Sequence, residues 1–356
     1  MIRSSIVQRK AAIAQLGEFL NTVAVKNKWG GYKTGVSENE FNDFVNKINT
    51  AFHSNGWFTK DMVIQACKSW AQLMNKTNLD IWLNQYEIPV SNYNKTVLII
   101  CAGNLPFVGW HDILCSYLCG FKVKVKLSSD DDKLIPAMLS ILSLFDHEIG
   151  NQIETVEGKS EGFDLVIATG SDNTNRYFES YFGSYPHIFR KSRTSIAVVN
   201  ENHNSEELSK LADDIFIYYG LGCRSITKIY LPTGYSTDFI FNALFKYKNV
   251  VNHNKYMNNY EYYRSIYLME GISFLDNGFL ILKEDENIFS PIGVLHYEFY
   301  NNLKKLENHL QSNNENIQCR VGEGGIPLGE AQKPELWDYA DGIDTIEFLT
   351  KNLKNN

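Results

Sequence analysis

The alternation of short apolar runs with helix-like stretches between residues 95 and 200 constrains the fold most. The run "KTVLIICAG" (95–103) is rich in β-branched residues and ends in glycine, which is typical of a buried parallel strand. After it come a helix-like stretch (110–120), the strand-like "FKVKVKL" (121–127), a second helix (133–145) and strand-like runs at 163–171 and 195–200. Strands separated by helices predict an open, mostly parallel α/β sheet.

The segments on either side of this alternation suggest a second lobe and a helical region. Residues 1–90 carry apolar side chains at three- and four-residue spacings, such as Ile13, Leu16 and Leu20, and predict helices. Beyond residue 200, a long helix-like stretch leads to Cys223 and then to the strand-like "SITKIYL". We therefore expect two lobes with these bounds: 1–205 rejoined by 326–356, and 206–325 carrying Cys223.

Composition limits the function classes. A chain of 356 residues with 44% hydrophobic and 21% charged residues is typical of a globular protein with two domains. Its net charge of −7 argues against nucleic acid as a main partner. No stretch approaches the roughly 18 apolar residues of a membrane span, and the N-terminus lacks the apolar core of a signal peptide. We expect a cytoplasmic protein with reduced cysteines and, in the absence of metal-type CxxC pairs, no metal site.

Four short segments carry residues that suit chemistry at strand ends. In "AGNLPF", Asn104 follows the first strand, where a side-chain amide can donate to an oxyanion. In "VKLSSD", Lys126 ends the second strand and can meet a ribose or a phosphate, and in "ATGS" the N–H groups around Gly170 and Ser171 can bind phosphate. In "GLGCRS", Cys223 suits a nucleophile on a turn. Taken singly, each of these residues also has a plain structural explanation: Asn104 as a turn residue, Lys126 as a solvated lysine, Gly170 as part of a turn and Cys223 as a small buried side chain.

The order and spacing of these segments resemble the aldehyde dehydrogenase superfamily, whose pieces read N-F-P, K-P-S-E, T-G-S and G-Q-x-C. The matching residues here are 104–106, 126–129, 169–171 and 220–223. A later "ENIFSP" is similar to the family's E-E-I-F-G-P, and the terminal "YADGIDTIEFL" resembles the LuxC-type branch of acyl-CoA reductases, which includes fatty-acid reductases. The resemblance spans residues 95–349 and implies an aldehyde-dehydrogenase-like α/β fold of two Rossmann-like lobes, the first of which binds the cofactor.

The resemblance also implies a role for each matched residue. Cys223 would accept the acyl group, and the Asn104 amide with the backbone N–H of Cys223 would form the oxyanion hole. Lys126 would contact the adenosine ribose, and the Gly170–Ser171 turn would cover the cofactor phosphates. Ser129 stands where the family has a carboxylate that would repel a 2′-phosphate, which favours NADPH, although acidic residues close by keep NADH open.

Two departures from the family pattern bear on the reaction. Hydrolytic members carry a glutamate that activates water, and the matching stretch "PHIFRKSRTSIAVV" places either His187 or Phe189 there, depending on the register. Without a carboxylate at that position, exchange of the acyl group between thiols is favoured over hydrolysis. In "ENIFSP", Asn287 matches the family's nicotinamide-ribose glutamate, and Glu286 lies one position away.

We therefore expect an NAD(P)H-dependent reductase that converts a fatty acyl-CoA thioester to the aldehyde through an acyl group on Cys223. Two alternatives stay open: a cofactor-free cysteine acyltransferase or thioesterase, and a non-catalytic subunit of an acyl-processing complex. The expected substrate is an acyl-CoA or acyl-carrier thioester, and a second copy of the chain or an acyl-transfer protein is the kind of partner that we expect.

Overall fold

The computed structural model describes residues 4–88 and 94–354. The chain forms two compact units, one of Met1–Lys191 with Glu335–Asn356 and the other of Ser192–Pro334. We expected the boundaries at 205 and 325. The first boundary falls at residue 191 and not at 205, because the strand at 194–198, which we had assigned to the first sheet, pairs with strands of the second unit.

Helices make up most of residues 4–88, as the periodicity predicted. Two of them begin at capping boxes, in which Ser5 and Gln8, or Ser37 and Glu40, bind each other's backbone N–H groups. The elements are α1 (Ile6–Asn21), the π-helical turn η1 (Thr22–Lys26), η2 (Tyr32–Thr34), α2 (Glu38–Thr50), η3 (Ala51–His53), α3 (Lys60–Leu73) and α4 (Lys76–Leu83). Apolar side chains of α1 are buried against α3 and against two helices of the following sheet region, α5 (Trp110–Leu118) and α6 (Leu134–Phe145), which attaches this region to the first unit.

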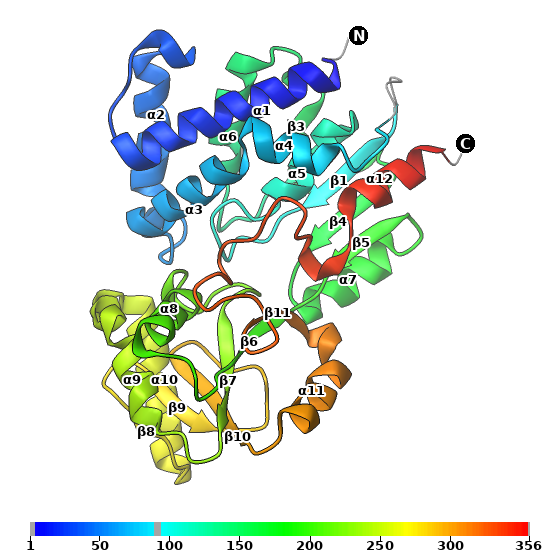
Figure 1. The fold of residues 1–356 in the computed structure, drawn as a ribbon. Coiled ribbons are helices and arrows are strands. Elements are labelled where there is room, and N and C mark those ends of the chain that lie inside the picture. Colours follow the sequence, from blue (N-terminus) through cyan, green and yellow to red (C-terminus); the bar gives the residue numbers. More distant parts are fainter. Residues whose placement is uncertain (1–3, 89–93, 355–356) are drawn as a thin grey trace. The chain divides into compact units, whose positions relative to one another are not determined.

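The first unit contains a five-stranded parallel sheet in the order β3-β2-β1-β4-β5 (Figure 1). Its elements are β1 (Thr96–Ile100), α5 (Trp110–Leu118), β2 (Lys122–Lys126), α6 (Leu134–Phe145), η4 (Ile149–Asn151), β3 (Ile153–Thr155), β4 (Leu165–Thr169), α7 (Asp172–Phe182) and β5 (His187–Arg190). On β2, Val123 and Val125 are buried and the three lysines that alternate with them are not, as the alternation predicted. The C-terminal segment returns to this unit through η7 (Ala340–Gly342) and α12 (Thr345–Lys354), and α12 packs against α5.

The second unit contains a six-stranded sheet in the order β11-β6-β7-β10-β9-β8, parallel except for β8. Its elements are β6 (Thr194–Val198), α8 (Ser205–Phe216), β7 (Ile226–Pro232), α9 (Thr237–Leu244), η5 (Phe245–Asn252), α10 (Asn254–Glu270), β8 (Leu275–Asp276), β9 (Ile281–Glu284), β10 (Val294–Tyr300), α11 (Leu303–Ser312), η6 (Asn314–Asn316) and β11 (Ile317–Gly322). Two mostly parallel sheets with helices confirm the predicted α/β class. Among the helices of residues 4–88 and 94–354, none is both long and apolar enough to cross a bilayer.

Candidate active site

Burial separates the six cysteines into two groups. Cys67, Cys101, Cys115 and Cys119 are buried, and desolvation raises the pKa of each thiol, that of Cys119 to about 12. Because the thiolate is the nucleophile, these four thiols are poor candidates for covalent chemistry near neutral pH. Cys223 and Cys319 are only half-buried. Exposure therefore agrees with the sequence in making Cys223 a candidate nucleophile.

Cys223 lies on the turn between α8 and β7, which we call the Cys223 turn (residues 217–225). Gly220 and Gly222 have φ angles of +81° and +84°, a region that glycine enters without strain. Ser225, at the end of the turn, is fully buried; its hydroxyl donates to Leu221 O at 2.6 Å and its backbone N–H to Gly222 O at 3.2 Å. The residues next to Cys223 are thus held by hydrogen bonds inside the turn.

Residues 329–331 of the same unit form hydrogen bonds with the Cys223 turn and with α8. The Arg224 side chain donates through Nε to the Ala331 carbonyl. The buried carboxylate of Asp214, on α8, accepts the N–H groups of Gly329 at 2.6 Å and Ala331 at 2.8 Å. Burial raises the pKa of Asp214 to about 6, although these two N–H donors favour its charged form. This segment contains none of the residues that the motifs singled out.

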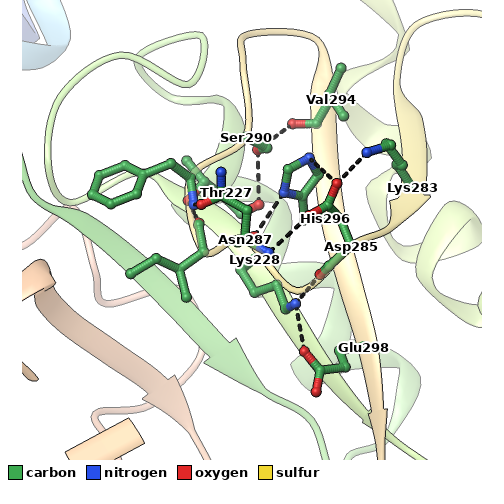
Figure 2. Close-up of polar contacts among 11 residues, drawn as sticks. Thr227, Lys228, Lys283, Asp285, Asn287, Ser290, Val294, His296 and Glu298 are labelled. Carbon is green, nitrogen blue, oxygen red and sulfur yellow. Dashed lines mark hydrogen bonds and ion pairs between the residues drawn. The ribbon is translucent and has the colours of Figure 1, made fainter. Parts of the chain in front are cut away.

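The loop 285–291 between β9 and β10 contains "ENIFSP". Side chains of the neighbouring strands donate hydrogen bonds to its main-chain carbonyls (Figure 2). Lys228 on β7 donates to Asp285 O, and Thr227 beside it donates to Ile288 O at 2.6 Å. His296 on β10 contacts Asn287 O at 2.8 Å through Nδ1, which carries the proton because a carbonyl only accepts. Three carbonyls within four residues are therefore held by side chains from the two neighbouring strands.

The charges around this loop explain how a lysine can lie in the sheet. Lys228 has no exposed surface, and its ammonium lies 2.8 Å from Glu298 Oε2 and 5.0 Å from the centre of the Tyr230 ring. A buried ammonium is tolerated when a carboxylate and carbonyls satisfy its donors. Burial lowers the pKa of His296, which keeps its ring neutral.

The two candidate ribose residues on this loop differ in what their side chains do. The Asn287 amide oxygen accepts the Phe289 N–H at 3.0 Å and closes a local turn. The Glu286 side chain is exposed. Asn287, the residue matched to the family's glutamate, therefore uses its side chain for a hydrogen bond within the loop, and the exposed carboxylate belongs to Glu286, one residue earlier.

The loop that carries Asn104 is anchored on both sides of this residue. Gly103 O accepts the Asn55 amide at 2.8 Å, and the Phe107 N–H donates to Asp131 Oδ2 at 3.1 Å. A Cβ on Gly103 would lie 2.5 Å from the Ser128 hydroxyl, so only glycine fits there. Asn104 itself is exposed. It belongs to the first unit and Cys223 to the second, and their joint oxyanion hole stays a prediction.

The four predicted cofactor residues all lie at the carboxyl ends of β2 and β4. The sheet order places β1 between these strands, and the chain reverses its direction of winding between β1 and β4, where open α/β sheets bind ligands. Lys126 donates to Gly158 O at 2.7 Å, which leaves two ammonium donors, and Ser129 is exposed in the next turn. Ser171 caps α7 by accepting the Thr174 N–H at 3.3 Å. A Cβ on Gly170 would lie 2.9 Å from Thr174 Cβ, so this helix approaches the turn closely.

The two positions matched to the hydrolytic glutamate lie on β5. His187 begins the strand, at the amino edge of the parallel sheet, and pairs in register with Val166 of β4. Its Nδ1 lies 2.8 Å from Tyr185 O, and its ring stacks on Phe189 at 3.9 Å. Phe189 is itself buried in the core with Phe178 and Val166. His187 therefore lies at the amino end of β5, whereas Phe189, one residue before the carboxyl end of the strand, has its side chain in the core.

Several residues of this arrangement were missed by motif analysis. Asn55 and Asp131 hold the Asn104 loop, and Lys228, Thr227 and His296 hold the 285–291 loop, all through main-chain groups that a sequence does not reveal. Within the described ranges, no group of three or more His, Cys, Asp or Glu side chains is placed to bind a metal ion.

Comparison with known proteins gives structural matches and no sequence match. No family model matches the chain, and no curated protein matches it significantly. Aldehyde dehydrogenase 21 from Physcomitrella patens, solved with its product succinate, is 12% identical with a TM-score of 0.64, over 98% of this chain and 84% of that one. An aldehyde dehydrogenase of Mycobacterium tuberculosis, complexed with NAD+, is 15% identical with a TM-score of 0.54, over 89% of this chain and 73% of its own.

A third structure extends the range of cofactors among these matches. The NADP-dependent glyceraldehyde-3-phosphate dehydrogenase from Bacillus halodurans C-125, complexed with NADP, is 14% identical with a TM-score of 0.60, over 89% of this chain and 74% of that one. Identities this low show a shared fold and nothing finer. The aldehyde-dehydrogenase-like fold expected from the sequence is thereby confirmed.

Proposed function

We propose that this protein reduces a fatty acyl-CoA or acyl-carrier thioester to the aldehyde with a nicotinamide cofactor, through an acyl group on Cys223. The observation that carries the proposal is the state of the cysteines in an aldehyde-dehydrogenase-like fold. Four thiols are buried with raised pKa values, whereas Cys223 is half-buried on a turn with a fixed backbone. A nucleophilic thiol needs this combination of access and rigidity.

The chemistry of the chain's own residues follows from thiolate attack. Cys223 Sγ bonds to the thioester carbonyl carbon, the oxygen becomes an oxyanion, and the carbon–sulfur bond to CoA breaks to leave the CoA thiolate, which takes up a proton. Asn104 and the Cys223 N–H would donate to that oxyanion. NADPH held by Lys126, Ser129, Gly170 and Ser171 would supply the hydride for reduction of the enzyme thioester. The resulting adduct on Cys223 collapses to the aldehyde and releases the thiolate.

The residues at the carboxyl edge of the first sheet fit the adenosine half of such a cofactor. Lys126 retains two donors for a ribose hydroxyl, and the N-terminal turn of α7 offers N–H groups to a phosphate. Ser129 carries no charge against a 2′-phosphate, which favours NADPH over NADH. Binding of the cofactor would then use Lys126, Ser129, Gly170 and Ser171.

A cofactor-free acyltransferase or thioesterase is less well supported. Such an enzyme uses a base beside its thiol, and the two histidines that would be candidates for this base, His187 and His253, have other contacts. His187 lies in the first sheet with Nδ1 against Tyr185 O, and the His253 ring caps α10. A non-catalytic subunit would have no need of an accessible thiol on a fixed turn.

Mass spectrometry of the acyl-enzyme tests the proposal. Wild-type protein incubated with an acyl-CoA is expected to gain one acyl group on Cys223 and, on addition of NADPH, to lose it as aldehyde. The variant Cys223→Ala is expected to gain none, whereas Cys319→Ala keeps the labelling because it leaves the nucleophile in place. Label on Cys101 or Cys319, or oxidation of NADPH at the same rate without acyl-CoA, would show that the proposal is wrong.

A further inference from the structure

Ser195, on β6, is completely buried and connects the Cys223 turn to β11. Its hydroxyl oxygen lies 2.9 Å from Cys223 O, 3.1 Å from Cys319 Sγ and 3.2 Å from Cys319 N. The sheet brings these residues together, because β6 pairs with β7 on one side and with β11 on the other. Cys319 lies at an irregularity in the β6–β11 pairing, between Ile317 and Arg320.

The direction of each hydrogen bond follows from the number of protons. A serine hydroxyl has one proton and two lone pairs, and a carbonyl can only accept. The Ser195 proton therefore goes to Cys223 O, and the Ser195 oxygen accepts from the Cys319 N–H and the Cys319 thiol. The hydrogen bonds thus run from the Cys319 thiol and N–H to the Ser195 hydroxyl, and from this hydroxyl to the carbonyl of Cys223, the proposed nucleophile.

The two peptide planes next to the Cα of Cys223 are thus both anchored. Gly222 O accepts the Ser225 N–H at 3.2 Å, and Cys223 O accepts the Ser195 hydroxyl. With both planes fixed, the direction of the Cα–Cβ bond of Cys223 is fixed, and χ1 alone sets where its thiol lies. The anchor matters because Gly220 and Gly222 lend this turn more backbone freedom than other residues would.

From this geometry we propose that Ser195 is a positioning residue for Cys223, acting through the Cys223 carbonyl, with Cys319 orienting the serine hydroxyl. The inference rests on the proposed role of Cys223 as acyl acceptor. A thiol that reacts with a bound thioester must be aligned with it, and misplacement by about 1 Å can cost roughly a hundredfold in rate. A small reagent arriving from solvent has no such requirement.

The test compares two reactions of the same thiol in the full-length protein. Acylation of Cys223 by saturating acyl-CoA and its alkylation by iodoacetamide are timed by peptide mass spectrometry. The variant is Ser195→Ala. The matched control is Tyr300→Phe, which removes a hydroxyl that donates to Val199 O at 2.8 Å, just beyond the other end of β6. Cys319→Ser, which keeps a donor to Ser195, is the conservative variant.

For Ser195→Ala we expect acylation about ten- to a hundredfold slower, with the KM for acyl-CoA and the alkylation rate of Cys223 within about threefold of wild type. Tyr300→Phe and Cys319→Ser are expected to acylate within about threefold of wild type. A structural defect would instead expose the four buried cysteines to iodoacetamide. The inference is wrong if Ser195→Ala acylates normally, if Tyr300→Phe slows acylation equally, or if alkylation falls in parallel. A wild-type protein that forms no acyl-Cys223 contradicts the proposed function itself, and the inference with it.

Discussion

The side chains that shape the second unit's candidate site bind main-chain groups. Ser195 and Ser225 donate to carbonyls of the Cys223 turn, and Thr227, Lys228 and His296 donate to carbonyls of the 285–291 loop. A carbonyl is present at every residue, so the partner of such a side chain leaves no mark in the sequence. Motifs could therefore single out the candidate nucleophile Cys223, whereas the residues that hold its turn could be found only from the fold.

At Asn104, the exposure of the side chain makes an activity change separable from a stability change. We expect Asn104→Ala to lower turnover by roughly 10²–10³, the usual loss for one oxyanion donor, with the KM for NADPH unchanged. The melting temperature should stay at the wild-type value, because the loop is anchored by Asn55 and Asp131 and not by Asn104. Steady-state kinetics and thermal unfolding measure the two effects. If turnover falls by less than threefold, Asn104 does not donate to the oxyanion.

At the scale of elements, the longer helices and strands could be predicted from the sequence and the shortest strands could not. The long amphipathic helices and the five-residue strands β1, β2 and β4 fall within the predicted runs. The three-residue β3 and four-residue β5 were missed, since so few residues show no clear period. β6 was found as a strand and placed in the wrong sheet, because strand pairing is a non-local property that its own residues do not encode.

The turn between β2 and α6 contains a carboxyl whose ionisation opposes folding. Asp131 is buried, and desolvation raises its pKa to about 6 in spite of N–H donors from Phe107 and Leu134. The folded state then favours the protonated form, so stability from this group is present below pH ~4 and is lost as pH rises through about 6.

We therefore expect the free energy of unfolding of the wild type, minus that of Asp131→Ala, to fall by about 2–3 kcal/mol between pH 4 and pH 7. Urea unfolding of both proteins at several pH values measures this difference. The exposed neighbour provides a matched control as Asp132→Ala. A difference that grows with pH would mean that the two N–H donors outweigh desolvation.

At the scale of the molecule, each unit contains a mostly parallel sheet, and the predicted cofactor residues and the candidate nucleophile Cys223 lie in different units. The order of the four motifs along the chain predicted this kind of fold through the resemblance to the aldehyde dehydrogenase superfamily that it carries. The identity of the second sheet could not be predicted: it assembles strands from residues 194 to 322 with long connections between neighbours.

The choice between thiol and water as acyl acceptor is a property of the whole reaction. Hydrolysis of an enzyme thioester needs a general base, whose help is typically worth 10²–10⁴-fold. His187 lies at the amino edge of the first sheet, three residues and about 10 Å of strand before the carboxyl edge of β5, and Phe189 is a core residue. Water attack should therefore be slow, whereas CoA, itself a thiol, needs less assistance.

Run in reverse, the proposed reaction should consequently require CoA. We expect an aldehyde with NADP+ to give little carboxylic acid, and addition of CoA to yield acyl-CoA with NADPH formation, both followed by absorbance and chromatography. The variant His187→Ala should leave this CoA-dependent rate unchanged, because the imidazole lies at the edge of the sheet away from the predicted cofactor residues. Brisk formation of the acid without CoA, abolished by His187→Ala, would identify a hydrolytic dehydrogenase with an imidazole base and contradict reduction of thioesters as the physiological reaction.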